Sequence, residues 1–476
     1  MNVLLISCYE IGRQPFGVAS AASWLQEAGH DVDCLDLAVE SLDEAKVKAA
    51  GLVAFYVPMH TATRIAIARL PEVVALKPDA HICFFGLYAP VNEEYLRKLG
   101  VQTVLGGEFE AALRQLAGRL ARGEGVAAQQ EGPVISLERQ EFRVPDRGRL
   151  PLLGNYAKVD MGDGQQRVAG YTEATRGCRH VCRHCPIVPV YGGRFRVVQA
   201  GVVLADIGQQ VRHGAQHITF GDPDFFNAPR HAIDIVRALH EEFPAVSYDV
   251  TIKIEHLRKQ FRLLPVLHDT GCLFVTSAVE AVDEATLERY EKNHTRQEFI
   301  DVTREFRRIG LSFNPTFVTF SPWTTLDSYA DLLSLLVELE MVDSVAPIQL
   351  AIRLLIPQSS RLLELPEMHD MIGPFDEAAL CYPWTHADPQ VDELHAQVLA
   401  RAQEGTAAGQ SRRTIFADVC RIVRDSLPPA SPYRDRLSAE RIAHAEVRDV
   451  PAMTEPWYCC AEPTEEQLLG ASTGQV

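Results

Sequence analysis

Three closely spaced cysteines constrain this 476-residue chain more than any other feature. Cys178, Cys182 and Cys185 follow the pattern C-x3-C-x2-C. A loop with this spacing can wrap three thiolates around one corner of a [4Fe–4S] cluster and leave the fourth iron open for a small molecule. A structural zinc ion is the alternative, and His180 or His184 could then supply the fourth ligand. The spacing favours the cluster.

The residues around these cysteines carry a resemblance to a known family. Arg176 and Gly177 precede the first cysteine and Pro186 follows the third, which resembles the signature of radical S-adenosylmethionine (SAM) enzymes. The resemblance implies that the three cysteines hold a [4Fe–4S] cluster whose open iron chelates the amino and carboxylate groups of SAM. The family usually has an aromatic residue near the adenine of SAM just before the third cysteine, and here that position is His184.

The composition is that of a globular protein with two or three domains, since 47% of the residues are hydrophobic and 23% are charged. A formal net charge of −17 argues against a broad nucleic-acid-binding face, which would have to be basic. Eleven cysteines in a chain of this length do not form a secreted disulfide scaffold. We find no signal peptide at the start and no apolar stretch of membrane-spanning length. These features predict a protein of the reducing cytoplasm, which an iron–sulfur cluster would require.

Residues 1–125 alternate short apolar runs with amphipathic helical patterns. This alternation predicts an α/β domain with a doubly wound, Rossmann-like parallel sheet. Ligands of such sheets bind at the carboxyl ends of the strands. The predicted strands are Val3–Ser7, Val32–Leu37, Leu52–Val57, His81–Gly86 and Val101–Leu105, and the predicted helices include Ala19–Ala28, Ile65–Leu76 and Glu110–Arg122.

No G-x-G-x-x-G motif follows the first strand, so the sequence does not predict a dinucleotide site. The layout resembles the cobalamin-binding domain that precedes many radical SAM cores. The D-x-H-x-x-G motif of the lower cobalt ligand is absent, and we interpret His60 as a loop residue rather than a ligand. The sequence therefore predicts a cobalamin-binding-like domain and leaves the cofactor itself open.

Residues 126–165 are rich in helix and strand breakers and are expected to form a linker. Residues 166–385 resume the strand–helix alternation with six strands, which suits the partial (β/α)6 barrel typical of radical SAM proteins. In barrels of this kind, functional residues cluster at the carboxyl ends of the strands. The predicted strands are Gly170–Thr175, His217–Gly221, Tyr248–Ile254, Cys272–Ala278, Ser312–Thr319 and Pro347–Leu355.

Polar residues follow several of these strands. Asp222 and Asp224 come directly after the second strand, where carboxylates can pair with an ammonium group or cap the next helix. The family resemblance implies that one of them contacts the amino group of SAM. It also implies that Glu280 binds the ribose hydroxyls with Ser277 nearby, and that Arg353 clamps the SAM carboxylate.

Residues 386–476 are predicted to form a helical region that ends in a tail with two adjacent cysteines, Cys459 and Cys460. Adjacent thiols rarely close a disulfide with each other, but they can present soft donors to a thiophilic atom or donate reducing equivalents. The alternative is two packed or surface thiols near a chain end.

The Cys-Cys-Ala-Glu-Pro ending resembles the tail of a radical SAM group in which some members have selenocysteine beside the first cysteine, and which includes an enzyme of arsinothricin biosynthesis. The resemblance implies that Cys459 and Cys460 hold trivalent arsenic, supplied as arsenite, and that a 3-amino-3-carboxypropyl radical from SAM forms a carbon–arsenic bond. Trivalent arsenic favours three thiolates, and the third would come from another cysteine of the chain. The candidates are Cys8, Cys34, Cys83, Cys272, Cys381 and Cys420.

Two further functions stay open at this point. The first is a cobalamin-assisted methyltransferase or a methylthiolase that acts through a 5′-deoxyadenosyl radical. The second is an iron–sulfur or zinc binding module without catalysis, which would not need polar strand ends suited to SAM. An enzyme of either radical type would take electrons from an external donor such as flavodoxin or ferredoxin.

Overall fold

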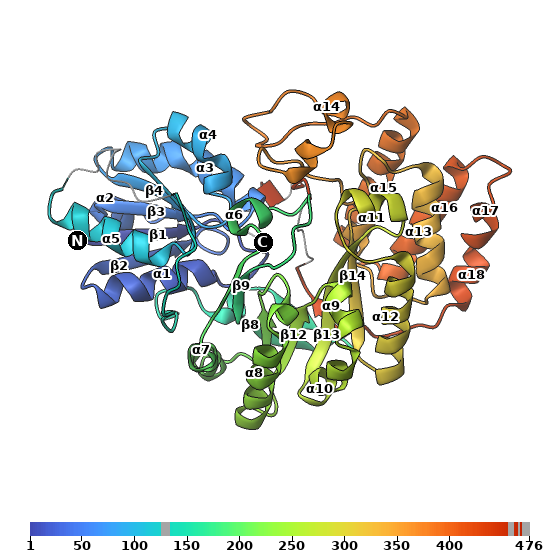
Figure 1. The fold of residues 1–476 in the computed structure, drawn as a ribbon, viewed down its shortest axis with the longest axis horizontal. Helices are drawn as coiled ribbons and strands as arrows, with labels where there is room; N and C mark the ends of the chain where they lie inside the picture. The colour runs from blue at the N-terminus through green and yellow to red at the C-terminus, as the bar shows by residue number, and fades with distance from the viewer. Residues whose placement is uncertain (125–133, 456–460, 465–466, 469–476) are drawn as a thin grey trace.

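The computed structural model describes residues 1–124, 134–455, 461–464 and 467–468. The chain runs from an N-terminal α/β domain, here called the front domain, through a barrel-like domain to a helical C-terminal region (Figure 1). Each of the first two parts is built on its own sheet, and the cysteine loop lies where they meet.

The front domain contains a six-stranded parallel sheet of order β2-β1-β3-β4-β5-β6. All five strands predicted for this region are present, and the structure adds a short sixth one. The strands are β1 (Asn2–Ser7), β2 (Asp31–Asp36), β3 (Leu52–Tyr56), β4 (His81–Phe85), β5 (Thr103–Gly107) and β6 (Ile135–Ser136).

Helices cover both faces of this sheet, because successive side chains of each strand point to opposite faces. In β1, Leu4 and Ile6 pack with α2, α3 and α4, whereas Val3 and Leu5 pack with α1 and α5. This burial on both faces explains why the strands read as continuous apolar runs. The helices are α1 (Phe16–Glu27), α2 (Glu44–Ala49), α3 (His60–Leu76), η1 (Pro90–Asn92), α4 (Glu93–Lys98) and α5 (Glu110–Ala121).

The barrel-like domain is built on a seven-stranded sheet of order β14-β13-β12-β11-β8-β7-β15. Five strands are parallel and match the first five predicted barrel strands, while β7 and β15 run antiparallel at the other edge. The strands are β7 (Lys158–Asp160), β8 (Gln166–Thr172), β11 (His217–Phe220), β12 (Ser247–Thr251), β13 (Cys272–Glu280), β14 (Ser312–Phe317) and β15 (Ala452–Met453).

The sixth predicted strand is wrong. Its first half is a short 3-10 helix, η6 (Pro347–Leu350), and its second half joins the sheet only through a bridge between Phe320 and Arg353. The proline at the start fixes a helix-compatible φ and removes a donor that a ladder would need. The barrel is therefore nearly closed rather than completed by a sixth regular strand.

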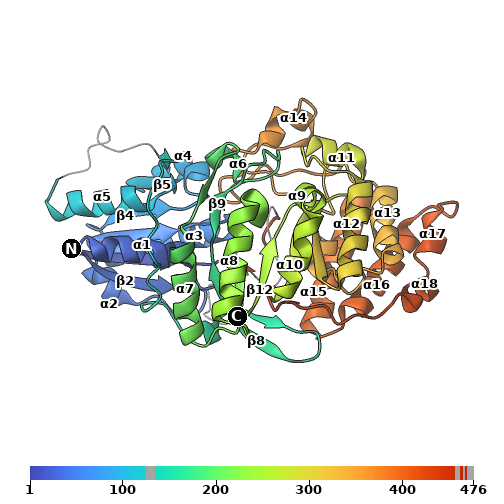
Figure 2. The same cartoon turned by 60° about the horizontal axis from the view of Figure 1, so that its bottom comes forward.

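Helices pack on the outside of the barrel sheet and form the largest hydrophobic core of the chain with it. Figure 2 shows α7 and α8 side by side along this outer surface. The helices are η3 (Leu153–Asn155), α7 (Ala200–Arg212), η4 (Phe225–Asn227), α8 (Pro229–Glu242), α9 (Ile254–Lys259), η5 (Phe261–Leu263), α10 (Leu264–Asp269), α11 (Glu284–Arg289), α12 (Arg296–Ile309) and α13 (Leu326–Glu338).

The C-terminal region is helical, as predicted, but it is not a separate layer. Two of its helices, α15 and α16, pack against α13 and η6 of the barrel, and β15 extends the barrel sheet. Helices η7 (Arg361–Glu364) and α14 (Met368–Met371) precede this region in the chain, and its own helices are α15 (Pro389–Ala407), α16 (Arg412–Ser426), α17 (Tyr433–Arg436) and α18 (Ala439–His444). The expected linker also differs, because β6 belongs to the front sheet and β7 to the barrel sheet.

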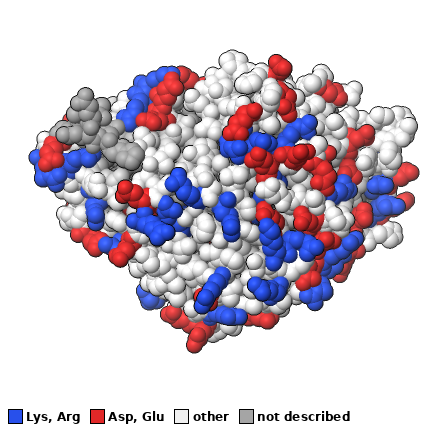
Figure 3. Space-filling view, in the orientation of Figure 1, with Lys and Arg blue, Asp and Glu red and all other residues white. Residues whose placement is uncertain are grey.

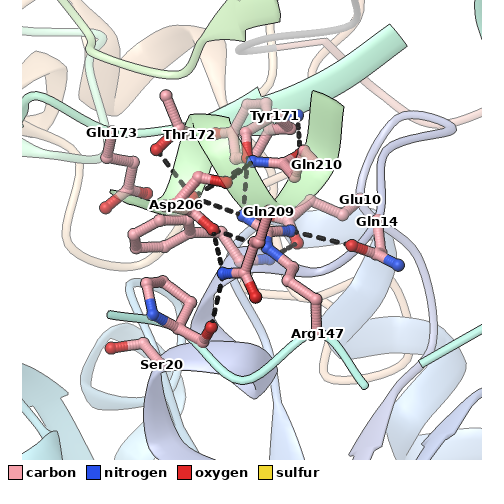
Figure 4. Close-up of polar contacts among 12 residues, drawn as sticks. Glu10, Gln14, Ser20, Arg147, Tyr171, Thr172, Glu173, Asp206, Gln209 and Gln210 are labelled. Carbon is pink, nitrogen blue, oxygen red and sulfur yellow. Dashed lines mark hydrogen bonds and ion pairs between the residues drawn. The ribbon is translucent and has the colours of Figure 1, made fainter. Parts of the chain in front are cut away.

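A buried arginine of the linker joins the two sheets. Arg147 donates to Asp206 at 3.0 and 2.9 Å, to the side chain of Gln14 at 3.0 Å and to the carbonyl of Tyr171 at 2.6 Å. Figure 4 shows how Arg147 and Asp206 lie between α7, β8 and the front-domain loop. Both side chains are 1% exposed, so loss of either partner would leave an uncompensated buried charge and cost about 3–5 kcal/mol.

The surface carries charges of both signs, interspersed on the face shown in Figure 3. Within the part of the chain that the structure describes, no helix combines the length and apolar character needed to cross a membrane.

Candidate active site

The front domain and the barrel enclose a cavity of about 300 Å³, and the three cysteines of the C-x3-C-x2-C loop line it. The loop begins after β9 (Thr175–Gly177), which pairs antiparallel with β10 (Phe195–Val197), and ends at the short helix α6 (Val188–Tyr191). Gly177 has a φ of +74°, and a Cβ there would lie 2.3 Å from the ring of Tyr191. A glycine is therefore required where the chain turns into the loop.

The cysteine thiols are suited to a metal centre rather than to free nucleophiles. Cys182 is buried, and Cys178 and Cys185 are partly buried. Burial, together with the negative charge of Asp224, raises the pKa of the Cys178 thiol to about 12. A positive metal centre would hold such a thiol as the thiolate that ligation needs. These residues thus fit the [4Fe–4S] cluster that their spacing predicts.

Glu280 reaches the cavity through a local distortion of β13. The pairing of β13 with β14 shifts register between Ala278 and Glu280, and Glu280 has a φ of +69°. Strained residues beside a bulge often re-aim a functional side chain. The carboxylate contacts His184 Nε2 at 3.1 Å and Lys292 Nζ at 3.4 Å, and all three residues line the cavity.

The electrostatics of this group are set by Lys292. Burial alone would raise the pKa of Glu280, but the Lys292 charge and the contact with His184 outweigh it and lower the pKa to about 2. Glu280 is therefore an anion beside a buried cation in the cavity wall. Sequence reasoning assigned no role to Lys292, because only the tertiary packing that buries this lysine brings it to Glu280.

The two aspartates after β11 have different positions. Asp222 accepts hydrogen bonds from Ala174 N at 2.9 Å and Thr175 Oγ1 at 2.6 Å, and it does not line the cavity. It therefore supports the start of β9 instead of facing SAM. Asp224 does line the cavity, and its carboxylate contacts His180 and His256.

Two other predicted SAM contacts lie away from the cavity. Ser277 is fully buried in β13 and absent from the cavity lining, because its neighbours Thr276 and Ala278 take the inward positions of the alternating strand. Arg353 is also outside the lining. Its guanidinium bonds to Asp392 at 2.8 Å and lies 3.6 Å from the ring centre of Trp384, so it is already fully engaged.

Arg353 instead holds the C-terminal tail. Its carbonyl accepts a hydrogen bond from Glu462 N at 3.3 Å, its Nε lies 3.9 Å from the Glu462 carboxylate, and Leu354 bridges to Ala461. Ala461 lines the cavity. Cys459 and Cys460 lie outside the described residues, so their predicted role is not tested.

The other cysteines do not complete a thiolate set at this cavity. Six described cysteines besides the loop are buried, and none of them is part of the cavity lining. Burial raises the pKa values of five of them, to about 12 for Cys34 and Cys381, as expected for core thiols. The six are Cys8, Cys34, Cys83, Cys272, Cys381 and Cys420.

The front-domain side of the cavity is held closed by Arg176. Its guanidinium contacts Glu110 at 2.6 Å, Glu173 at 2.8 Å and Glu108 at 3.5 Å, and it is 7% exposed. It also lies within about 5.5 Å of the ring centres of three phenylalanines, which are Phe16, Phe109 and Phe142. A residue of the cysteine loop region is thus anchored in the front domain, which fixes the cavity between the two.

Comparison with known proteins agrees with this geometry. Residues 172–336 match the Radical SAM superfamily model. This segment contains the cysteine loop and the parallel barrel strands β11 to β14. It is 23% identical to an uncharacterized methyltransferase of Pyrococcus horikoshii over 65% of this chain and 70% of that protein. It is 24% identical to the hopanoid C-3 methylase of Methylococcus capsulatus over 65% of this chain and 62% of that protein.

Two solved radical SAM structures share the fold. The methyltransferase TsrM of Kitasatospora setae, with cobalamin and a [4Fe–4S] cluster bound, matches with a TM-score of 0.65 at 15% identity and covers 91% of this chain and 92% of its own. The cobalamin-dependent enzyme OxsB, with aqua-cobalamin and SAM bound, gives a TM-score of 0.67 at 15% identity, over 93% of this chain and 71% of its own. The fold expected from the sequence, a Rossmann-like domain before a radical SAM barrel, is confirmed.

Proposed function

We propose that this radical SAM enzyme transfers an alkyl group from SAM to a small acceptor that binds between the front domain and the barrel. The observation that carries this proposal is that the cluster cysteines, the Glu280–Lys292 pair and the front-domain loops all line one cavity. When bound, the [4Fe–4S] cluster supplies the electron that breaks a carbon–sulfur bond of SAM. We expect the electron to come from an external donor such as flavodoxin or ferredoxin.

The chain's own residues would position SAM. Lys292 offers a buried cation to a carboxylate, and Glu280 offers an anion to ribose hydroxyls or an ammonium group. His184 lines the same wall, and its Nδ1 has no hydrogen-bond partner among the described residues. That nitrogen can bind a polar edge of the adenine. Because these groups are fixed before SAM arrives, little reorganisation is needed during the reaction.

Methyl transfer is the version that the relatives support. Both the Pyrococcus protein and the hopanoid C-3 methylase are named as methyl-transferring enzymes. The likeness to TsrM and OxsB raises the question of cobalamin, since both of those proteins bind it.

The front domain gives cobalamin little room. The ring of Tyr56 fills the crevice at the carboxyl ends of the strands, where a Cβ on Gly17 would lie 2.3 Å from it and a Cβ on Gly86 would lie 3.1 Å from it. The residues present therefore do not fit cobalamin, and we derive no step through it.

Transfer of the 3-amino-3-carboxypropyl group to trivalent arsenic is the second candidate. The observation that favours it is the position of the tail, because Ala461 of the Cys-Cys-Ala-Glu-Pro segment lines the cavity and Glu462 lies beside Arg353. A small acceptor such as arsenite is also compatible with a cavity of this size.

The deciding experiment follows the carbon atoms of SAM. The reconstituted, reduced protein is incubated with SAM that is isotopically labelled in the methyl group or in the aminocarboxypropyl group. Arsenite or a small-molecule cell extract serves as the acceptor, with or without added cobalamin, and products are identified by mass spectrometry. The Cys178→Ala variant is the control for chemistry that does not need the cluster.

Each outcome has a definite meaning. Methyl label in an acceptor, with S-adenosylhomocysteine as co-product, supports methyl transfer. Methylthioadenosine with an arsenic compound that carries the aminocarboxypropyl label supports the second candidate. Only 5′-deoxyadenosine, with neither label in any acceptor, would overturn alkyl transfer and return the enzyme to hydrogen-abstraction chemistry.

A further inference from the structure

A second group of metal-ligating side chains lies on the barrel wall beside the cysteine loop. His180, Asp224 and His256 come from the cysteine loop, the segment after β11 and helix α9. All three residues are buried, and one ligand atom from each lies within 4.8 Å of the others. None of them belongs to the C-x3-C-x2-C set, and the proposed alkyl transfer gives them no role.

Two of the distances within this group are close to those between ligand atoms of a single ion. His180 Nε2 lies 3.2 Å and His256 Nδ1 lies 2.7 Å from Asp224 Oδ2. Two atoms bound to the same tetrahedral zinc ion lie about 3.3 Å apart, because each bond is about 2.0 to 2.1 Å long. Small side-chain movements would therefore bring all three atoms to bonding distance of one metal.

The orientation of His256 is the second observation that points to a ligand. Its buried Nδ1 lies 2.7 Å from the Asp224 carboxylate and makes no well-aligned hydrogen bond among the described residues. A neutral imidazole nitrogen in this position can bind one divalent ion together with the carboxylate oxygen.

Neighbouring groups hold the ligands in place. Asp224 Oδ1 accepts a hydrogen bond from Phe226 N at 3.0 Å, which leaves Oδ2 for the metal. Glu255 Oε2 lies 3.5 Å from His180 Nδ1, the ring nitrogen that a metal on Nε2 would leave protonated. Such carboxylate–histidine contacts are usual around metal ligands. Asn227 accepts from Arg179 N at 3.2 Å and thereby fixes the loop that carries His180.

The charges around the group are balanced before an ion is added. Asp224 and Glu255 are acidic, and Lys253 and Lys259 are basic, with Lys253 Nζ 3.3 Å from His180 Nδ1 and Lys259 Nζ 2.5 Å from Glu255. A divalent ion would therefore add positive charge. With the metal on Nε2, His180 Nδ1 would carry a proton that Glu255 can accept and that Lys253, which is only a donor, cannot.

The geometry points to a mononuclear site for a divalent transition metal, Zn²⁺ or Fe²⁺, held by His180, Asp224 and His256. Two histidines with one carboxylate form a ligand set that zinc enzymes and non-haem iron enzymes use with open coordination positions. His180 and Asp224 line the cavity, and His256 lies behind them. The open position thus faces the space between the domains, where it can bind a donor atom of the acceptor near the cluster.

The test measures metal binding without SAM chemistry. The three cluster cysteines are replaced by alanine, the protein is treated with a chelator, and Zn²⁺, Fe²⁺ or Co²⁺ is added under anaerobic conditions. We expect one equivalent to bind, with a Co²⁺ absorption spectrum that has no thiolate charge-transfer band. Anomalous diffraction from a zinc-soaked crystal should place the ion between the three side chains.

Matched variants make the assignment specific. His256→Gln should weaken binding by at least a hundredfold, and Glu255→Gln should weaken it by about ten- to a hundredfold through loss of the contact to His180. His217→Gln is the control, because His217 is a buried histidine that contacts the carboxylate of Asp249 at 2.9 Å and belongs to no three-ligand group among the described residues. It should leave metal binding unchanged.

The proposal is overturned if His256→Gln binds the ion as tightly as the parent, if the ion lies elsewhere in the crystal, or if no ion binds. The Glu255→Gln result decides the question if His256→Gln does not fold. Because binding is measured in a protein without the cluster, failure here says nothing about alkyl transfer, and failure of alkyl transfer leaves this site intact.

Discussion

The barrel side and the front-domain side of the cavity wall consist of different kinds of side chains. The barrel half presents the cysteine loop and paired charges such as Glu280 with Lys292. The front-domain half presents mainly aromatic and aliphatic groups, including Phe16, Tyr56 and Phe109. Charged groups on one side suit a polar cofactor that must be held in one orientation, whereas an apolar wall shapes space and excludes water.

This difference indicates that the barrel half of the cavity wall contains the groups that act on SAM. In the barrel half, Glu280 and Lys292 line the cavity itself, whereas Glu108 and Glu110 of the front domain contact Arg176. Arg176 also contacts Glu173 after β8, and Arg147 of the linker contacts Asp206 on α7. Substitutions in the barrel half should therefore affect catalysis, and those in the front half should affect stability and the shape of the acceptor space.

Loss of a cluster ligand should have the largest effect. Cys178→Ala should abolish both the iron–sulfur absorbance and all cleavage of SAM, because three thiolates are needed to hold the cluster. Absorbance spectroscopy and product analysis measure the two effects. Cys420→Ala, at a buried cysteine of α16 outside the cavity, should keep both. Full SAM cleavage by Cys178→Ala would refute the assignment of the site.

Loss of the domain anchor should be the largest effect on stability. Arg176→Met leaves Glu108, Glu110 and Glu173 buried without their shared cation, so we expect a loss of about 3–5 kcal/mol in the free energy of unfolding. Urea denaturation measures it. Arg212→Met, on α7 and remote from the cavity lining, should cost less than 1 kcal/mol. Equal losses in the two variants would remove the special role of this anchor.

Glu280→Gln should separate binding from stability within the barrel half. Gln keeps the shape but removes the charge beside Lys292, and we expect SAM affinity to fall by about tenfold or more, as judged by equilibrium binding. Because the folded-state pKa of Glu280 is lowered to about 2, its stabilising contribution is present above the usual glutamate range and lost as the pH falls towards 2.

The stability difference between the parent and Glu280→Gln should accordingly be full at pH 7 and shrink below about pH 4. The control is Glu288→Gln, at an exposed position of α11. An unchanged affinity for SAM would show that Glu280 only supports the fold.

The front-domain crevice provides the mildest test. The parent protein should take up no stoichiometric cobalamin, because Tyr56 fills the space between Gly17 and Gly86. Absorbance after gel filtration measures this. Tyr56→Val should enlarge the crevice and change the acceptor preference more than the rate of SAM cleavage. Binding of one equivalent of cobalamin by the parent protein would show that the front-domain half also binds a cofactor. It would favour cobalamin-assisted methyl transfer.

Local sequence was enough to predict most strands of the two sheets and the cysteine loop. The strands of the front domain and the first five strands of the barrel could be predicted because strands buried on both faces are continuous apolar runs between breakers. The cluster loop could be predicted because all three ligands lie within eight residues of one another. The presence of Glu280 and Asp224 at the cavity also followed from their positions at strand ends.

Tertiary structure decided the rest. Ser277 lies one step of strand alternation from the residues of β13 that face the cavity, and Arg353 contacts Asp392 and Trp384, which lie 39 and 31 residues away in the chain. Lys292 lies in the site because tertiary packing buries it against Glu280. The sequence by itself determined which segments form strands and which loop can hold a cluster, since those depend on neighbours in the chain. Only the fold decided which polar side chains face the cavity. Whether a charged side chain is paired within the protein depends on partners from distant segments of the chain.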